Sequence, residues 1–268
     1  MKFLYIGDIM GKFGRWVTER ELPGLRAEYE PDFVIAQAEN VTHGSGINRQ
    51  HYGELKRLGI DGFTSGNHIF KREDIQPLLD DPAAPITRPA NYPAGNQGVP
   101  YKTLSTSRGE VILITLMGQI VGKDADVPAN NPLHDIDNIL QAIRPPRPIA
   151  TIVNFHGDYS SEKVVIGQYL DGKVTAVIGD HWHIPTADAR ILSGGTAHMS
   201  DVGMVGARDS SLGVDTEIIV RRWRGEEQGS NQLSERGTYQ FSCVLVDVDE
   251  STGLARDIQH IFRSGVTG

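Results

Sequence analysis

Short apolar runs alternate with helix-like segments along most of the chain, and polar residues directly follow several of these runs. An alternation of strands and helices predicts an α/β fold, in which the carboxyl ends of the strands carry the ligand site. The runs that we interpret as strands are residues 2–6, 33–38, 62–65, 111–116, 149–155 and 174–178. The order of elements therefore constrains both the fold class and the place where function is expected.

Helix signals lie between these strands. A helical region is expected from about Arg15, interrupted at Pro23, because proline lacks the N–H that a helix interior needs. Asn48 is a typical N-cap for the segment that follows it, and Gly59 is expected to end that segment. Further helices are expected over residues 74–79, 131–143 and 161–170.

The end of the chain has a different pattern. The runs "FSCVLVDVD" and "ARDIQHIF" flank the turn "ESTG" and alternate like an antiparallel hairpin. The polar, glycine-rich segment 224–237 before them is expected to be an exposed loop. Because neither an internal repeat nor a dividing linker is evident, we predict a single domain over residues 1–268.

Composition argues against several classes of protein. Twenty-six basic and 34 acidic residues give a formal charge of -8, which opposes a broad nucleic-acid surface but allows a small phosphate ligand if metal ions balance its charge. The single cysteine, Cys243, excludes an intrachain disulfide and a cysteine-rich zinc site. No apolar run is long enough for a signal peptide or a membrane span, so we expect a cytoplasmic protein with no membrane partner.

The polar residues that follow the predicted strands are of types that bind metals. They are Asp8, Glu39, Asn40, Asn67, His68, His156, His181 and His183. Each has an ordinary alternative: Asp8 suits a helix cap, Glu39 and Asn40 a polar loop, and the last two histidines one face of an edge strand. One shared ligand explains their common position at strand ends more economically than separate coincidences do.

The chemistry of this set favours particular metals. Carboxylate and amide oxygens combined with imidazole nitrogens, without a thiolate, suit manganese, iron or zinc better than calcium. The candidates outnumber the four ligands of a tetrahedral zinc, which favours two metals that share a bridging carboxylate. The glycines of "GDIMGKFGR" match neither a dinucleotide fingerprint nor a P-loop.

These motifs resemble a known group of enzymes. "GD" after the first strand, "GNH" after the third and the late "GDHWH" resemble the calcineurin-like metallophosphoesterases. "YIGDIMGKFGR", "AENVTHGSGI", "SGNHIF", "RPANYP", "FHGDYSSEK", "GDHWHIPTAD" and "MSDVGMVG" more closely resemble the YmdB-like family of 2',3'-cyclic nucleotide phosphodiesterases, from Lys2 to about Trp223. The resemblance implies a sandwich of two mixed β-sheets flanked by helices, and it favours a homo-oligomer.

The resemblance also implies a ligand set for two divalent or trivalent metal ions. Manganese or iron is favoured, and zinc or magnesium is the alternative. Asp8 and His183 would hold one ion, with Asn40 joining that ion or its surroundings. The other ion would be held by Asn67, His156 and His181, and Glu39 would bridge the two.

Other positions have implied roles towards a substrate. His68 would be the general acid, and His43 is a candidate substrate contact. Trp182 either stacks on a base or packs beneath the site, and Arg88 either meets a phosphate or pairs structurally. The close family often has Glu at the position of Asp158 and Thr at the position of Trp182, which leaves substrate preference open.

The expected function is hydrolysis of 2',3'-cyclic nucleotides or related phosphodiesters by metal-hydroxide attack. One alternative is a phosphomonoesterase or protein phosphatase of the same superfamily, which would cleave monoesters faster than cyclic diesters. The other is a regulator that binds a nucleotide or an RNA end without turnover, in which His68 would be dispensable.

Overall fold

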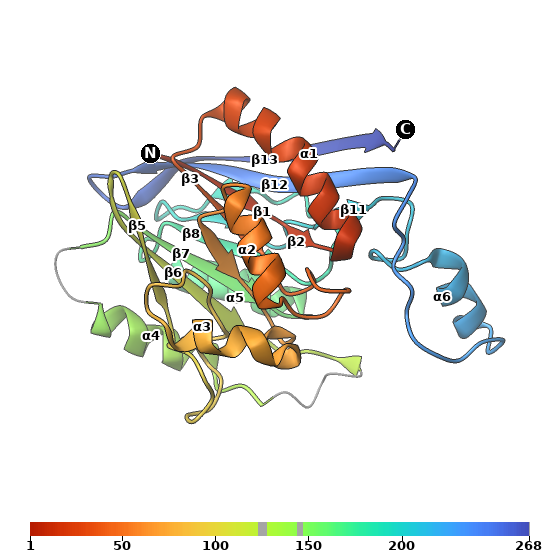
Figure 1. Cartoon of the computed structure of the whole chain (residues 1–268). Helices are drawn as coiled ribbons and strands as arrows, with labels where there is room; N and C mark the ends of the chain where they lie inside the picture. Colours follow the sequence, from red (N-terminus) through yellow and green to blue (C-terminus); the bar gives the residue numbers. More distant parts are fainter. Residues whose placement is uncertain (123–127, 144–146, 268) are drawn as a thin grey trace.

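Two β-sheets pack face to face in the computed structural model of this chain, and helices cover their outer faces (Figure 1). The structure describes residues 1–122, 128–143 and 147–267. The strands of the first sheet are β1 (Lys2–Ile6), β2 (Asp8–Ile9), β3 (Phe33–Gln37), β4 (Gly62–Thr64), β11 (Met204–Ala207), β12 (Thr238–Asp249) and β13 (Leu254–Val266). Their order is β2-β11-β12-β1-β3-β4, with β13 paired to β12.

The second sheet is built from the middle of the chain. Its strands are β5 (Lys102–Thr106), β6 (Gly109–Met117), β7 (Ala150–His156), β8 (Ala176–Asp180), β9 (Arg190–Ile191) and β10 (Ala197–Met199), in the order β5-β6-β7-β8-β10-β9. Strands β1, β3 and β4 are parallel in the first sheet, as are β6, β7, β8 and β10 in the second, while antiparallel strands flank both groups. Both sheets are therefore mixed, which confirms the predicted fold class.

Helices cover the outer face of each sheet. They are α1 (Gly11–Tyr29), α2 (Arg49–Arg57), α3 (Gln76–Asp80), α4 (Pro132–Ala142) and α5 (Ser160–Leu170), and a further helix is α6 (Thr216–Trp223). Two 3-10 turns, Ile69–Lys71 and Glu73–Ile75, precede α3. Helix α6 belongs to an arm that projects from the body of the molecule (Figure 1). In the described part of the chain, no helix has the length and apolar character needed to cross a membrane.

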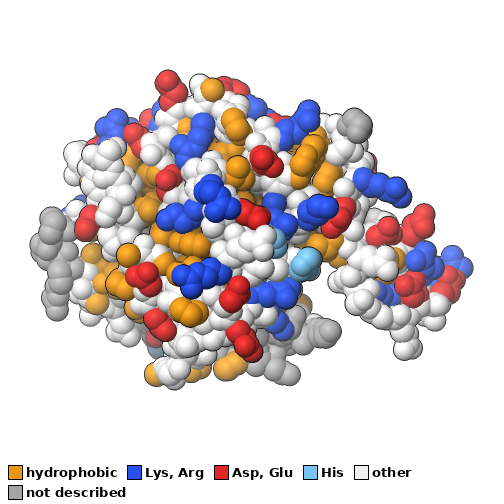
Figure 2. Space-filling model, viewed as in Figure 1, with side chains coloured by type: hydrophobic (Ala, Val, Ile, Leu, Met, Phe, Trp, Pro, Cys, Tyr) orange, Lys and Arg blue, Asp and Glu red, His pale blue; other side chains and the backbone are white. Residues whose placement is uncertain are grey.

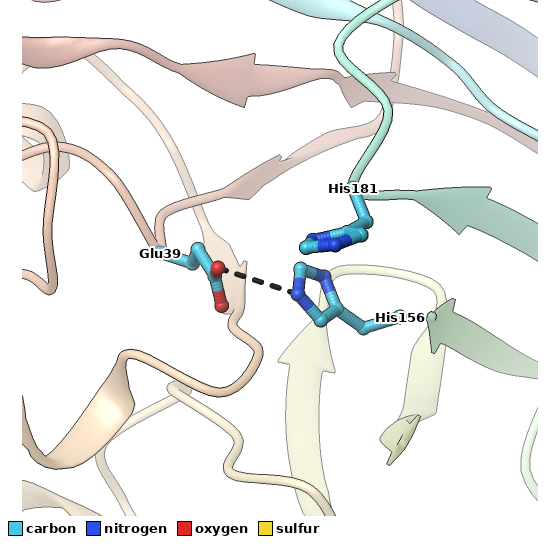
Figure 3. A group of neighbouring side chains, drawn as sticks. All are labelled: Glu39, His156 and His181. Atoms are coloured by element: carbon cyan, nitrogen blue, oxygen red, sulfur yellow. Dashed lines mark ion pairs between the residues drawn. The ribbon is translucent and has the colours of Figure 1, made fainter. Parts of the chain in front are cut away.

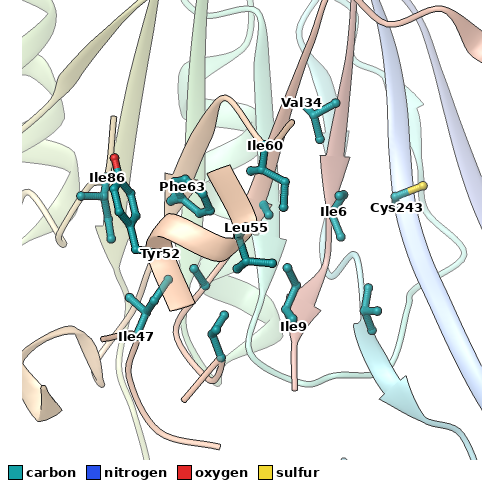
Figure 4. Packing of buried hydrophobic residues seen from close by; sticks show 14 of the residues in the cluster. Ile6, Ile9, Val34, Ile47, Tyr52, Leu55, Ile60, Phe63, Ile86 and Cys243 are labelled. Carbon is teal, nitrogen blue, oxygen red and sulfur yellow. The ribbon is translucent and has the colours of Figure 1, made fainter. Parts of the chain in front are cut away.

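The core has three layers. Two of them lie on the two faces of β1 and its neighbours, which are buried on both sides. Side chains alternate along a strand, so β1 directs Phe3 and Tyr5 towards the second sheet, and Leu4 and Ile6 towards the helices. The rings of Phe3 and Phe33 stack at 5.4 Å in the layer between the sheets. Figure 4 shows the helix side, where residues of β1, β3, β4 and α2 pack together. The third layer lies between the second sheet and α4 and α5.

Several predicted boundaries agree with the structure. Asn48 caps α2 by accepting a hydrogen bond from the His51 backbone N–H, and Gly59 follows that helix with φ of 93°. Asn131 caps α4 in the same way, with Pro132 as the first helical residue. Strands β12 and β13 form the predicted hairpin, although both are longer than the sequence runs indicated. Residues 224–237 contain neither helix nor strand.

Two predictions were wrong in detail. Helix α1 begins at Gly11 and continues through Pro23, because Pro23 faces solvent while Val17, Leu22 and Leu25 anchor the buried side of the helix. The strand predicted at 174–178 lies two residues later, because its pairing with β7 extends to Asp180 opposite His156. The candidate ligands follow strands of both facing sheets.

Candidate metal centre

The predicted ligands converge where strands of both sheets end. From the first sheet come four residues with oxygen ligands: Asp8, Glu39, Asn40 and Asn67. From the second sheet come three imidazoles: His156 at the end of β7, and His181 and His183 just after β8. All of these residues except His181 are buried. The two sheets thus build the site jointly.

Asp8 lies in the site and does not cap the following helix. The N-cap of α1 is Met10, which makes no side-chain capping bond. Asp8 Oδ2 accepts a 2.6 Å hydrogen bond from Asn40 Nδ2 and lies 3.0 Å from His183 Nε2. Asp8 Oδ1 is buried without a hydrogen-bond partner. An unpaired buried carboxylate oxygen is unfavourable unless it binds a cation, so this atom fits a metal ligand.

His183 is oriented by the backbone of the arm. Its Nδ1 donates a 3.1 Å hydrogen bond to the carbonyl oxygen of Leu212, which turns Nε2 towards Asp8. Burial opposes protonation, but the hydrogen bond and charge of Asp8 outweigh it and raise the pKa of His183 to about 9. Fixing one ring nitrogen on a carbonyl is the usual way to present the other to a metal.

A second group gathers around Glu39. Figure 3 shows its carboxylate pointing at His156, with His181 beside it, and one ligand atom from each lies within 4.8 Å of the others. Glu39 Oε1 is 3.3 Å from His156 Nε2, and the two imidazole rings meet edge to face at 4.5 Å. Burial raises the pKa of Glu39, but the charge and hydrogen bond of His156 outweigh burial and lower it to about 2. Burial and the neighbouring His156 lower the pKa of His181 to about 4.

His156 is held from both sides. Its Nδ1 donates a 2.6 Å hydrogen bond to Asp180 Oδ1, and its Nε2 lies 2.9 Å from Asn67 Oδ1. Asp180 is itself fixed, because its Oδ2 accepts a 2.7 Å hydrogen bond from Asn154. A carboxylate on the far nitrogen of a ligand histidine fixes the ring orientation and strengthens the ligand.

His68 lies at the edge of both groups. Its Nδ1 is 2.9 Å from Asn40 Oδ1 and 3.2 Å from Glu39 Oε1, and its backbone N–H donates to Glu39 Oε2 at 3.3 Å. The side chain is 20% exposed, whereas that of Glu39 is 1% exposed. His68 is therefore within reach of a molecule that approaches from solvent.

The glycine of "GNH" is required by the closeness of the two sheets. A Cβ atom at Gly66 would lie 2.0 Å from Glu39 Oε2 and 2.5 Å from His156 Nε2. Such distances do not occur between non-bonded atoms, so any other residue would displace a candidate ligand. Gly66 lets the backbone pass next to Glu39 and His156.

Residues 181–183 form a bend rather than the edge strand that was the alternative interpretation. His181 has φ of 101° and His183 has φ of 63°, which are uncommon values for residues with a side chain. His181 Nε2 lies 3.2 Å from Asp158 Oδ1, and Trp182 Nε1 donates a 3.0 Å hydrogen bond to the Asp158 carbonyl oxygen. The indole of Trp182 is thus held against the protein.

The other predicted substrate contacts differ from each other. His43 is exposed, has φ of 55°, and its ring lies 6.5 Å from that of His51. Arg88 is 7% exposed and donates to the backbone carbonyl oxygens of Pro89, Ala90, Gln97 and Gly98. The geometry therefore gives Arg88 a structural role, and the substrate role of His43 stays a prediction.

The residues present fit bound cations. The donor set combines hard oxygens with imidazole nitrogens, the unpaired Asp8 Oδ1 is available as a ligand, and His156 and His183 are already oriented by partners on their far nitrogens. In the region where Figure 2 shows histidine side chains at the surface, a hollow separates the body from the arm that carries α6.

Some residues that support this site were not predicted from the sequence. Lys163 and Asp201 are buried next to the 181–183 bend, and Leu212 supplies the carbonyl oxygen for His183. The spacing of Lys163 relative to Ile166 and Leu170 matches one buried helix face, which was a usable signal. Nothing in the sequence pattern marks the backbone of Leu212.

The fold and the site together define a mixed α/β sandwich of the calcineurin-like metallophosphoesterase type, with a cluster of candidate metal-ligand residues at one rim. The family described as YmdB-like protein matches residues 4–261. The chain belongs to this YmdB-like family, as its motifs indicated.

Individual relatives are similar over nearly their whole length. The 2',3'-cyclic-nucleotide 2'-phosphodiesterase of Bacillus subtilis (strain 168) is 34% identical over 261 residues, which cover 97% of this chain and 96% of that protein. The crystal structure of a phosphatase from Mycoplasma pneumoniae has a TM-score of 0.89 at 30% identity and covers 98% of this chain and 93% of its own. A hypothetical protein from Thermus thermophilus has a TM-score of 0.88 at 30% identity, covering 98% of this chain and 99% of its own.

Proposed function

We propose that this protein is a dinuclear-metal phosphodiesterase that hydrolyses 2',3'-cyclic nucleotides or related phosphodiesters. Its relatives are described as a phosphodiesterase and a phosphatase, which makes the chain a phosphoric ester hydrolase. The observation that carries the proposal is the meeting of four oxygen-ligand residues and three imidazoles at one rim, with a buried, unpaired oxygen on Asp8. That arrangement has an evident use in holding cations and little use in stabilising the fold.

The ligands divide into two groups in this proposal. Asp8, His183 and Asn40 would hold one ion, and Asn67, His156 and His181 the other, with Glu39 bridging them. Manganese or iron is the proposed metal, and zinc or magnesium is the alternative. When bound, two such ions supply a hydroxide near neutral pH and neutralise charge on the phosphoryl oxygens.

His68 would deliver the proton that the leaving ribose oxygen needs. Its Nδ1 is held by Asn40 and Glu39, so the imidazole is oriented by the residues that would also hold the metals. The partial exposure of the side chain allows contact with a substrate. A general acid at this position would donate a proton only when the substrate is correctly placed on the ligand frame.

The test compares turnover of 2',3'-cyclic AMP by manganese-loaded wild type and His68→Ala at equal metal content. General acid catalysis contributes about 100- to 10,000-fold, so His68→Ala should lower kcat by that range and retain both metals. His134→Ala is the matched control, because His134 is an exposed residue of α4. A variant that loses metal instead would make His68 a ligand or a structural residue.

A phosphomonoesterase is the second candidate, because the Mycoplasma pneumoniae relative is described as a phosphatase. It would use the same metals but cleave a nucleoside monophosphate faster than the cyclic diester. A metal-replete wild type that binds 2',3'-cyclic AMP without turnover would instead indicate a nucleotide or RNA-end-binding regulator.

Further expectations about this protein stay predictions. They are a small nucleotide substrate rather than a broad nucleic-acid surface, a cytoplasmic location, a single-domain organisation and a homo-oligomer. Light scattering on the purified chain measures the last of these directly.

A further inference from the structure

Among the residues that the structure describes, two lysines are almost completely buried, and their surroundings differ. Lys102 and Lys163 are each 1% exposed. Lys102 donates to the carbonyl oxygens of Leu78, Leu79 and Asp81 at the end of α3, away from the candidate metal centre. Lys163 instead lies directly behind the bend that carries His181 and His183.

Lys163 makes three contacts at or next to this bend. Its ammonium group donates to the backbone carbonyl oxygen of Asp180, the residue before His181. It lies 3.2 Å from Asp201 Oδ2 and 4.6 Å from the centre of the Trp182 ring. Because Lys163 lies on the buried face of α5, these contacts connect the bend to the helix that packs on the second sheet.

Asp201 extends the same set of contacts. It is fully buried, and its Oδ2 accepts a 2.9 Å hydrogen bond from the backbone N–H of Trp182. Its Oδ1 accepts a 2.9 Å hydrogen bond from the backbone N–H of Gly203. Trp182, the residue between the two histidines, is therefore fixed by both its backbone and its ring.

The backbone of the bend needs such support. His181 and His183 have positive φ values, which cost free energy and persist only where the surroundings impose them. A buried ion pair such as Lys163 with Asp201 contributes little net stability compared with apolar residues of the same volume. Its effect is therefore expected on the geometry of the bend more than on the stability of the fold.

We propose that Lys163 is a positioning residue that, together with Asp201, holds the 181–183 bend so that His181 and His183 face the metal centre. The inference rests on the proposed role of these two histidines as metal ligands. Lys163 itself would touch neither metal nor substrate.

The experiment measures Mn²⁺ affinity by titration and the thermal unfolding of the metal-free protein in three variants. Lys163→Met removes the ammonium group, and Lys163→Met with Asp201→Asn also removes the carboxylate charge that the first variant leaves buried alone. Lys102→Met is the matched control, because it removes an equally buried lysine that donates to carbonyl oxygens elsewhere.

Both Lys163 variants are expected to bind Mn²⁺ about 10- to 100-fold more weakly than wild type, as for other residues that orient metal ligands. Lys102→Met should keep wild-type affinity, whatever its melting temperature. Turnover of the Lys163 variants should recover as Mn²⁺ concentration rises, because the ligands remain present.

Affinities within twofold of the Lys102→Met control would overturn the proposal. So would a failure of both Lys163 variants to fold, because Lys163 would then be a structural residue. A wild type that binds no Mn²⁺ would contradict the proposed metal centre itself, which separates the two failures.

Discussion

The two sheets contribute different chemistry to the same site. The first sheet supplies the oxygens of Asp8, Glu39, Asn40 and Asn67, whereas the second supplies the imidazoles of His156, His181 and His183. Neither sheet alone supplies both the oxygens and the imidazoles of this candidate site. The site therefore depends on how the two sheets are packed, and the layer of Phe3, Phe33 and their neighbours fixes that packing.

The two halves also differ in how they are held in place. Among the described residues, positive φ values occur at His181 and His183 but at none of the oxygen ligands from the first sheet. A carboxylate binds a cation in several orientations, whereas an imidazole must aim one ring nitrogen. This explains why partners such as Asp180 and Leu212 gather behind the histidines.

The largest effect is expected where the two halves meet. Gly66→Ala would place a methyl group 2.0 Å from Glu39 Oε2 and 2.5 Å from His156, which forces the oxygen and nitrogen ligands apart. Because bound metals contribute several kcal/mol to such reactions, kcat/KM should fall about a thousandfold or more. Gly53→Ala is the control, since beyond the backbone of its own helix the added Cβ would meet no atom closer than 3.7 Å.

Steady-state hydrolysis of 2',3'-cyclic AMP and metal analysis of both variants check this prediction. Wild-type activity in Gly66→Ala would mean that Glu39 and His156 need not lie this close, and the shared site between the two sheets would be wrong.

The residues that meet at the rim could be picked out as candidate ligands from the sequence because each follows an apolar run. That pattern does not show which sheet each run joins. The strands β9, β10 and β11 have only two to four residues and give no clear alternation, so they could not be predicted. The helix was expected to be interrupted at Pro23, but an exposed proline is tolerated where the opposite face of the helix is well packed. The hydrogen bond to the carbonyl oxygen of Leu212 could not be predicted, because a backbone contact does not depend on the type of side chain.

A moderate effect is expected from removing a partner of one histidine of the second sheet. Asp158→Ala removes the carboxylate that lies 3.2 Å from His181 Nε2 and accepts a hydrogen bond from the Val121 backbone. Mn²⁺ affinity should fall about 10- to 100-fold, because His181 loses the partner that orients its ring. Asp171→Ala is the control, since Asp171 accepts hydrogen bonds from residues 193, 194 and 196 at the other end of α5.

Calorimetric titration with Mn²⁺ measures both variants. Equal affinities for Asp158→Ala and Asp171→Ala would show that His181 needs no partner, and the contrast between the two sheets would then rest on His156 and His183.

The smallest effect is expected at Trp182, where the sequence left stacking on a base and packing beneath the site open. The indole N–H donates to Asp158 and the ring lies over Lys163, so the side chain is already engaged by the protein. Trp182→Phe keeps the ring and loses one hydrogen bond, which contributes about 0.5–1.5 kcal/mol. If the activation free energy rises by the same amount, kcat should fall about two- to tenfold.

The comparison of purine and pyrimidine substrates decides between the two roles of Trp182. If the indole only supports the bend, Trp182→Phe should change kcat/KM for 2',3'-cyclic AMP and 2',3'-cyclic UMP by the same factor, because the lost hydrogen bond is remote from the base. A larger rise in KM for the adenine substrate would mean that the ring stacks on the base, since the larger base gains more from stacking. In that case the 181–183 bend would contribute to substrate specificity as well as position His181 and His183.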